Sequence, residues 1–210
     1  MREPVTRMLY EYWNDVRGGR FAPQRFEIEP SCIASILPDT FILERFDGKT
    51  SRFRLAGTRI CEAFVAEFRG VNLLELFEDE DRVTLERQLS VIARQGAVGL
   101  FTIGAETEPD RTVRFEMVIL PLLHTRETVD RFIGSLVPLD RHAWLGTAPL
   151  MNTKLLTVEM IWPDGRPHAV VERAHHQAPF MPHIREARIV RSDRRQFRVY
   201  DGGLGKLDKD

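Results

Sequence analysis

Arginine side chains give this chain its clearest capacity to bind an anion. A guanidinium group presents N–H donors in a planar fork and can bind a carboxylate or phosphate through two parallel hydrogen bonds. Four arginines are candidates for such contacts at the mouth of one ligand site: Arg17, Arg25, Arg54 and Arg114. The alternative, that each is salt-bridged or solvated, stays open because this is the commoner role of arginine.

Histidines offer metal binding or proton transfer. Four lie late in the chain: His168, His175, His176 and His183. Their spacing fits no tight ligand set and no cysteine lies near, so no metal site is expected. His124 is the candidate general base, but no serine or cysteine in a strained turn accompanies it. The sequence therefore predicts a protein that is not an enzyme.

Large apolar residues of the predicted strands and helices could line a cavity that holds a ligand. They are Phe53, Leu55, Ile60, Phe64, Phe68, Leu89, Phe101, Phe115, Met117 and Leu136. Phe53 and Leu55 are alternate residues of one strand, so they are expected to point to the same face. The alternative is that the whole set forms a filled core, because protein interiors are close-packed.

The strand predicted at residues 131–139 is the one around which the other elements are arranged. Large apolar residues fall on both alternating sets of its positions, which indicates a strand covered on both faces. Further strands are predicted at residues 41–46, 52–56, 98–105 and 112–120, and helices at 3–16, 31–37, 58–68 and 79–95. This order predicts an α+β fold, with a five-stranded antiparallel sheet covered on one face by helices. Pairing the first strand with the last would place the last one centrally.

The N-terminal helix carries an apolar stripe at spacings of three and four residues. A single helix cannot bury this stripe alone, so it must pack on the domain or on a second copy. We expect the stripe to be a dimer or partner surface, since an exposed apolar surface needs a cover. The residues proposed for it are Met8, Leu9, Tyr12 and Trp13.

Three parts of the chain are distinguished by their composition. Residues 1–20 hold the amphipathic helix, 21–145 the main domain, and 146–210 a C-terminal extension. In the extension, strands are predicted at 155–162, 169–171, 188–190 and 196–199, and residues 202–210 are expected to be disordered. Six of its arginines are expected to form a solvated face, with docking of nucleic acid or an acidic partner as the alternative: Arg185, Arg188, Arg191, Arg194, Arg195 and Arg198.

Composition limits the class of protein. The 30 basic and 31 acidic residues give a net charge of -1, which argues against a nucleic-acid binder. Cys32 and Cys61 are too few for a disulfide framework. With no signal peptide and no long apolar run, we expect a cytoplasmic protein without a membrane segment.

A set of short motifs in the first two thirds of the chain is similar to the PAS domain family. The resemblance is closest to bacterial PAS-like proteins that stand alone and carry an N-terminal helix. It rests on these residues: Tyr12-Trp13, Arg17-Gly18-Gly19, Pro23, Arg25, Leu37-Pro38, Phe53-Arg54-Leu55-Ala56-Gly57-Thr58, Pro121-Leu122 and Gly134.

This resemblance implies sensing and regulation of other proteins rather than catalysis. The expected partners are a second copy or a signalling protein, with a small-molecule ligand as a further option. Haem and flavin are not expected, because no histidine precedes His124 and the surroundings of Cys61 do not resemble a flavin-binding PAS motif. The alternative is an enzyme of the isomerase type that uses the apolar cavity, which would need an acidic residue inside it.

Overall fold

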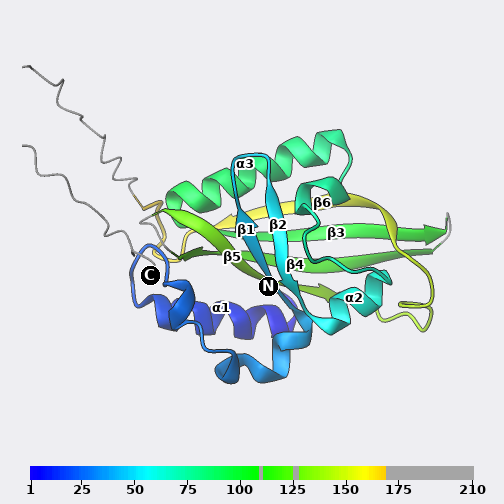
Figure 1. Cartoon of the computed structure of the whole chain (residues 1–210), viewed down its shortest axis with the longest axis horizontal. Helices are drawn as coiled ribbons and strands as arrows, with labels where there is room; N and C mark the ends of the chain where they lie inside the picture. The colour runs from blue at the N-terminus through cyan, green and yellow to red at the C-terminus, as the bar shows by residue number, and fades with distance from the viewer. Residues whose placement is uncertain (109–110, 125–127, 169–210) are drawn as a thin grey trace, which may run out of the picture. The chain divides into compact units, whose positions relative to one another are not determined.

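The computed structural model describes residues 1–108, 111–124 and 128–168 (Figure 1). They belong to one compact unit, Met1–Val171, which includes both the N-terminal helix and the first strand of the predicted extension. The predictions made for residues 169–210 lie outside the described residues. This holds for three histidines, His175, His176 and His183, and for the cluster of six arginines from Arg185 to Arg198.

Helices and strands alternate irregularly along the chain. In order they are α1 (Pro4–Arg17), the 3₁₀ helices η1 (Arg25–Glu27) and η2 (Pro30–Asp39), β1 (Thr40–Arg45), β2 (Ser51–Ala56), α2 (Thr58–Phe64), the 3₁₀ helix η3 (Leu73–Leu76), α3 (Asp79–Gln95), β3 (Val98–Glu108), β4 (Arg111–Leu123), β5 (Val129–Pro138) and β6 (Met151–Ile161). Within the described ranges, no helix is long and apolar enough to cross a membrane.

The strands form one antiparallel sheet in the order β2-β1-β5-β4-β3-β6. β5 lies between β1 and β4, with Thr40 opposite Ser135 and Phe41 opposite Gly134. The predicted pairing of the first strand with the strand at 131–139 is therefore confirmed, as is the α+β class. The predicted number of five strands is wrong, because β6 pairs along β3 as a sixth.

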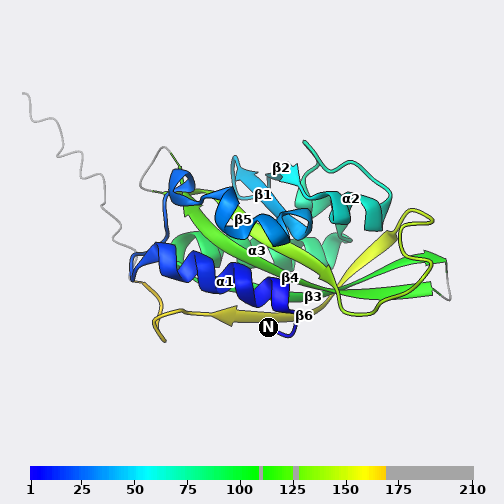
Figure 2. The ribbon, with the colours of Figure 1, turned by 90° about the horizontal axis from the view of Figure 1, so that it is seen from below.

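Helices cover both faces of the sheet, which corrects the prediction of a single covered face. On one face, α2, η3 and α3 pack over buried residues that include Phe101 and Phe115. On the other face, α1 and η2 pack over residues that include Leu120 and Ile133. Figure 2 shows α1 in front of the sheet and α3 behind it. This double cover explains why β5 is apolar on both alternating sets of positions.

The contact between β1 and β5 requires a glycine at one position. A Cβ atom at residue 134 would collide with the ring of Phe41 and with the carbonyl oxygen of Val118. Phe41 is fully buried and lies opposite Gly134 in the register. Glycine here leaves the space that this aromatic ring occupies beside the central strand.

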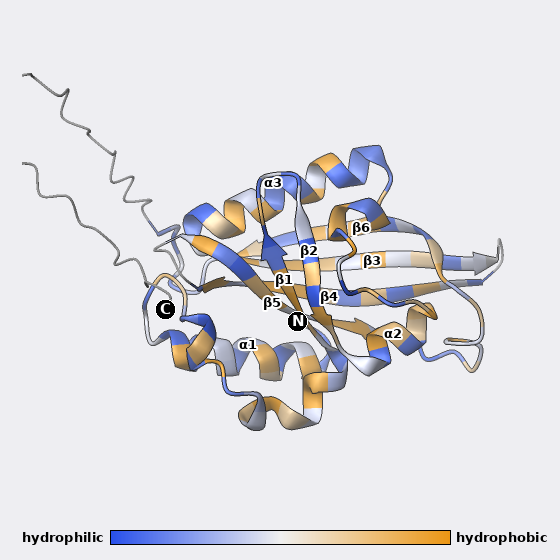
Figure 3. Ribbon diagram, viewed as in Figure 1, coloured by the Kyte–Doolittle hydropathy of each residue, from blue (hydrophilic) through white to orange (hydrophobic). Residues whose placement is uncertain are grey.

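The two long helices, α1 and α3, carry both hydrophilic and hydrophobic residues (Figure 3). Pro4 occupies the first turn of α1, and the helix ends at Gly18 in the left-handed conformation, with φ 56°. In α3, three acidic residues lie in the first turn, where the helix dipole favours negative charge. Gly96 ends α3 with φ 62°, and the predicted bounds of 79–95 are confirmed.

Helix α2 is shorter than predicted. It ends at Phe64, because Val65 adopts the left-handed conformation with φ 51° and its N–H binds the carbonyl groups of Cys61 and Glu62. The residue at the N-cap is Gly57 rather than the predicted Thr58. Phe68 lies beyond the helix and is nevertheless buried.

Candidate functional site

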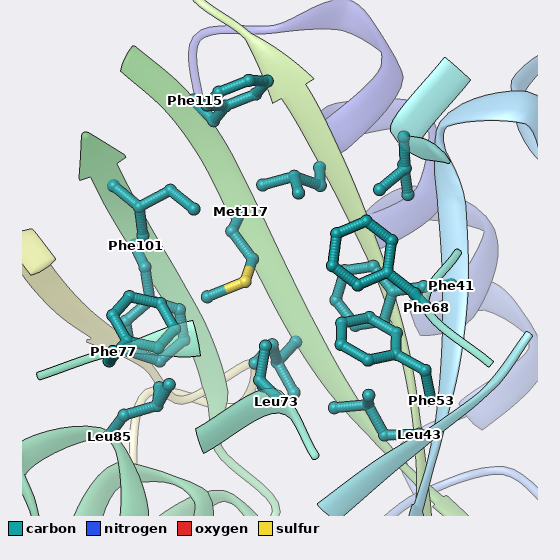
Figure 4. Packing of buried hydrophobic residues seen from close by; sticks show 14 of the residues in the cluster. Phe41, Leu43, Phe53, Phe68, Leu73, Phe77, Leu85, Phe101, Phe115 and Met117 are labelled. Atoms are coloured by element: carbon teal, nitrogen blue, oxygen red, sulfur yellow. The ribbon is translucent and has the colours of Figure 1, made fainter. Parts of the chain in front are cut away.

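The aromatic residues predicted to line a cavity lie together on the face covered by α2 and α3 (Figure 4). The ring centroids of Phe53 and Phe68 are 5.0 Å apart, and that of Phe64 lies 5.3 Å from Phe68 and 5.2 Å from Phe115. These are contact distances for aromatic pairs. The same buried cluster contains Ile60, Leu89, Phe101, Met117 and Leu136. The structure thus favours the filled-core alternative at these rings.

Leu55 does not belong to this cluster, so the prediction that it shares the face of Phe53 is wrong. The register between β1 and β2 shifts after Ile42, which lies opposite Leu55, while Leu43 lies opposite Phe53. This β-bulge leaves Arg54 as the extra residue and turns Leu55 to the other face. As a result Leu55 is 48% exposed, although its neighbour Phe53 is buried.

On that other face, Leu55 borders a groove of about 420 Å³ between η2 and the strands β1, β2 and β5. We call it the apolar groove. Its lining residues are Arg25, Ile28, Pro30, Ile33, Ala34, Leu37, Pro38, Thr40, Ile42, Leu55, Ala56, Gly57, Thr58 and Ile133. Ile28, Ile33 and Ile133 are buried there. The Thr40 hydroxyl donates to the carbonyl oxygen of Leu37, so this polar group is already satisfied.

Arg25 is the one charged residue that lines the apolar groove. It opens the short helix η1 and is half-buried. The nearest acidic residue of that helix, Glu27, is engaged elsewhere: it accepts the backbone N–H of Gln24 at 2.7 Å and pairs with Arg20 at 3.0 Å. Arg20 also holds the pKa of Glu27 below its usual value. The charge of Arg25 is therefore not offset by its neighbour in η1.

The other three arginines predicted as anion contacts do not gather with Arg25, which corrects that expectation. Arg54 pairs with Glu44 at 3.3 Å. Arg114 binds both carboxylate oxygens of Asp140 at 2.9 Å, and this contact lowers the pKa of Asp140. Arg17 is likewise paired, as described below. The alternative of separate salt bridges holds for these three.

The predicted partner stripe on α1 is largely covered by the sheet of the same chain. Leu9 and Trp13 are fully buried in the cluster beneath α1. The indole N–H of Trp13 donates to the carbonyl oxygen of Pro121 in β4 at 2.9 Å. Met8 is 45% exposed and Tyr12 is half-buried. Leu9 and Trp13 therefore cannot form a surface for a second copy, because they hold α1 on its own domain.

Two carboxylates that sequence reasoning missed hold the ends of α1. Glu116 in β4 is buried and accepts the backbone N–H groups of Arg2 and Glu3 at 2.7 and 3.0 Å. Asp164 follows β6 and binds both terminal nitrogens of buried Arg17 at 2.8 Å. Hydrogen bonding from Arg17 lowers the pKa of Asp164 to about 2.

The sequence offered a signal for only one of the two. Glu116 is a single acidic residue among the apolar residues of a predicted strand, which indicates a specific partner. Asp164 lies in a turn 147 residues from Arg17, and no local pattern predicts that pairing.

A second depression, a cleft of about 670 Å³ with both charged and apolar lining residues, lies where the start of α1, the helix α2 and the residues after β5 meet. Phe115 and Leu136, both predicted as pocket residues, reach it from the core. Two of its charged residues, Arg59 and Asp39, are paired with each other at 2.7 Å. Among the residues described, no group of three metal-binding side chains occurs.

The family model of the PAS domain matches residues 1–137. The chain belongs to the PAS domain family. No match to a curated protein was found. The family match includes α1 and all strands of the sheet except β6 and the last residue of β5.

Among the residues that carry the PAS resemblance, two groups are brought together in space. One group attaches α1 to the sheet and includes Trp13, Arg17 and Pro121. The other borders the apolar groove, where seven of its fourteen lining residues belong to the PAS motifs. These seven are Arg25, Leu37, Pro38, Leu55, Ala56, Gly57 and Thr58. We therefore take the apolar groove as the candidate functional site.

Proposed function

We propose that this PAS domain is a non-catalytic regulatory module that binds an apolar molecule in the apolar groove and passes the change to another protein through surface contacts. The observation that carries the proposal is the groove itself: Leu55 is turned out of the core by a β-bulge and borders a depression lined mainly by aliphatic side chains. Exposed apolar surface of this kind is typical of a binding site.

The opposite face of the sheet supports the choice of this site over the interior. There the rings of Phe53, Phe64, Phe68 and Phe115 lie in mutual contact, so they occupy the space in which an interior ligand would lie. The apolar groove reaches the surface and needs no rearrangement of that core.

A route from the groove to the surface runs through η2 and α1. Ile33 lines the groove and shares a buried cluster with Leu9 and Trp13 of α1. At the start of η2, the backbone N–H of Glu29 donates to the Tyr12 hydroxyl at 2.8 Å. A ligand that favours one position of η2 would therefore bias the packing of α1, as expected for a population shift.

The buried groups also support a role without catalysis. Among the described residues, two acidic side chains are buried, Asp39 and Glu116, and Asp39 is paired with Arg59 at 2.7 Å. The buried carboxylate on the other face, Glu116, is occupied by two backbone N–H groups. His124, the candidate base, is exposed at the end of β4.

Equilibrium binding of the neutral dye Nile red tests the proposal. We compare the wild type with Leu55→Ser and with the control Leu156→Ser, since Leu156 is 50% exposed on β6 outside the groove. We expect saturable binding that Leu55→Ser weakens and Leu156→Ser leaves unchanged. Absence of binding, or equal loss in both variants, would overturn the assignment of the groove.

Hydrogen exchange in the same samples tests the relay. Dye binding should slow amide exchange in η2 and should also change exchange in α1, through the contacts of Ile33 and Glu29. A change restricted to the groove residues would contradict a regulatory role for this site.

A further inference from the structure

The apolar groove combines a hydrocarbon-like lining with one available positive charge. Thirteen of its fourteen lining residues are uncharged, and the exception is Arg25. Within the described part of the chain, the Arg25 guanidinium makes no hydrogen bond or ion pair, and Glu27 beside it is engaged by Arg20 and Gln24. A positive charge at the border of an apolar site favours an anionic group on the molecule that binds there.

We propose that the apolar groove binds an aliphatic carboxylate, with its carboxylate group on Arg25 and its hydrocarbon chain over Ile28, Ile33 and Leu55. This inference rests on the proposed function of the groove and deepens it by naming the ligand class. It differs from a ligand held in the interior of the domain, where aromatic rings fill the space.

The single guanidinium group of the groove favours a carboxylate as the head group of the ligand. One guanidinium group matches the two oxygens of one planar carboxylate through paired hydrogen bonds. A phosphate dianion carries two negative charges and three terminal oxygens. A single arginine would neutralise only one of these charges and would leave at least one oxygen without a donor. No second charged residue lines the groove to neutralise the remaining charge.

The size of the site favours a small molecule over a protein segment. A volume of about 420 Å³ lies within the usual range of about 300–1,000 Å³ for small-ligand sites. The fourteen lining residues are fewer than the roughly 20–30 residues that each side of a standard protein interface contributes. Four isoleucines and two leucines are among the lining residues, which suits a flexible hydrocarbon chain.

Displacement of Nile red by decanoate, below its micelle concentration, tests this assignment. We compare the wild type with Arg25→Gln and with Arg69→Gln, an exposed arginine outside the groove. Loss of a charge-assisted contact should weaken decanoate binding about tenfold or more in Arg25→Gln. Arg69→Gln should bind decanoate and Nile red as the wild type does, and in Arg25→Gln the loss of decanoate affinity should exceed any change in Nile red affinity.

Two further competitors define the head group. 1-Decanol has the same chain without the charge, so it should compete more weakly than decanoate in the wild type and equally in Arg25→Gln. Decyl phosphate should not compete better than decanoate. Equal decanoate affinity in Arg25→Gln and wild type, or stronger competition by decyl phosphate, would refute the carboxylate assignment.

The outcomes separate this inference from the function on which it rests. If Nile red binds at Leu55 but decanoate does not displace it, the ligand class is wrong and the groove remains a binding site. If Nile red does not bind, both proposals fall.

Discussion

The charged contacts at the two ends of α1 show how single residues fix the position of an element. Arg17 is almost fully buried, with its side chain 3% exposed, and its charge is met by Asp164 in a two-pronged contact. Its guanidinium also lies 5.6 Å from the centre of the Trp13 ring. A buried guanidinium without its partner is strongly unfavourable, so this contact holds α1 to the turn after β6.

We expect Asp164→Asn to lower the unfolding temperature at pH 7 by several degrees. The pKa of Asp164 is about 2 in the folded protein, below its ordinary 3.8, so the ionised form stabilises the fold at pH above about 4. That contribution should disappear as the pH falls from about 4 through about 2. In Asp164→Asn this part of the pH dependence should be missing.

Thermal unfolding followed by circular dichroism between pH 7 and pH 2 measures both effects. Asp15→Asn is the matched control, because Asp15 is exposed on α1. If Asp164→Asn and Asp15→Asn unfolded at the same temperatures throughout this range, the contact with Arg17 would not contribute to the fold.

Among the elements, β2 contributes one residue to the core and the next apolar residue to the candidate site on the opposite face. Before its bulge, Phe53 packs into the aromatic cluster; after it, Leu55 faces the groove. Alternation along a strand could not predict this, because a bulge depends on how β2 pairs with β1. The apolar pattern of 131–139, by contrast, correctly predicted a strand covered on both faces, since that pattern depends only on burial.

Gly134 gives a test of the packing between β1 and β5. We expect Gly134→Ala to reduce the free energy of unfolding by about 1–3 kcal/mol or more, because the added methyl group would overlap the Phe41 ring and the Val118 carbonyl. Gly104→Ala in β3 is the control, since its Cβ would meet only the Leu156 side chain, at 3.3 Å. Urea unfolding of both variants measures the difference. Equal stability would contradict the close approach of β1 to β5.

At the scale of the whole molecule, the sheet has a filled face and an incompletely covered face. The α2–α3 face holds the aromatic cluster, whereas the α1–η2 face leaves the apolar groove beside β1 and β2. The sequence predicted the PAS family and most elements from local patterns. It could not predict that Leu9 and Trp13 pack against the sheet of their own chain, because an apolar stripe does not identify the surface that it packs on.

The groove itself was also missed by sequence reasoning. Ile33 and Ile133 are one hundred residues apart in the sequence, and they meet at one site because β1 pairs with β5 and η2 packs beside them. Arg25 was predicted as an anion contact, but the three arginines proposed with it lie in separate ion pairs.

Methyl NMR of isoleucine-labelled protein titrated with decanoate tests the central claim most directly, because isoleucines report on both faces of the sheet. The groove contains Ile28, Ile33, Ile42 and Ile133. The α2–α3 core contains Ile60, Ile92, Ile103 and Ile119. We predict saturable shifts of the first four methyl signals and none beyond small changes in the second four. Shifts concentrated in the second group would place the ligand in the interior and contradict the assignment of the groove.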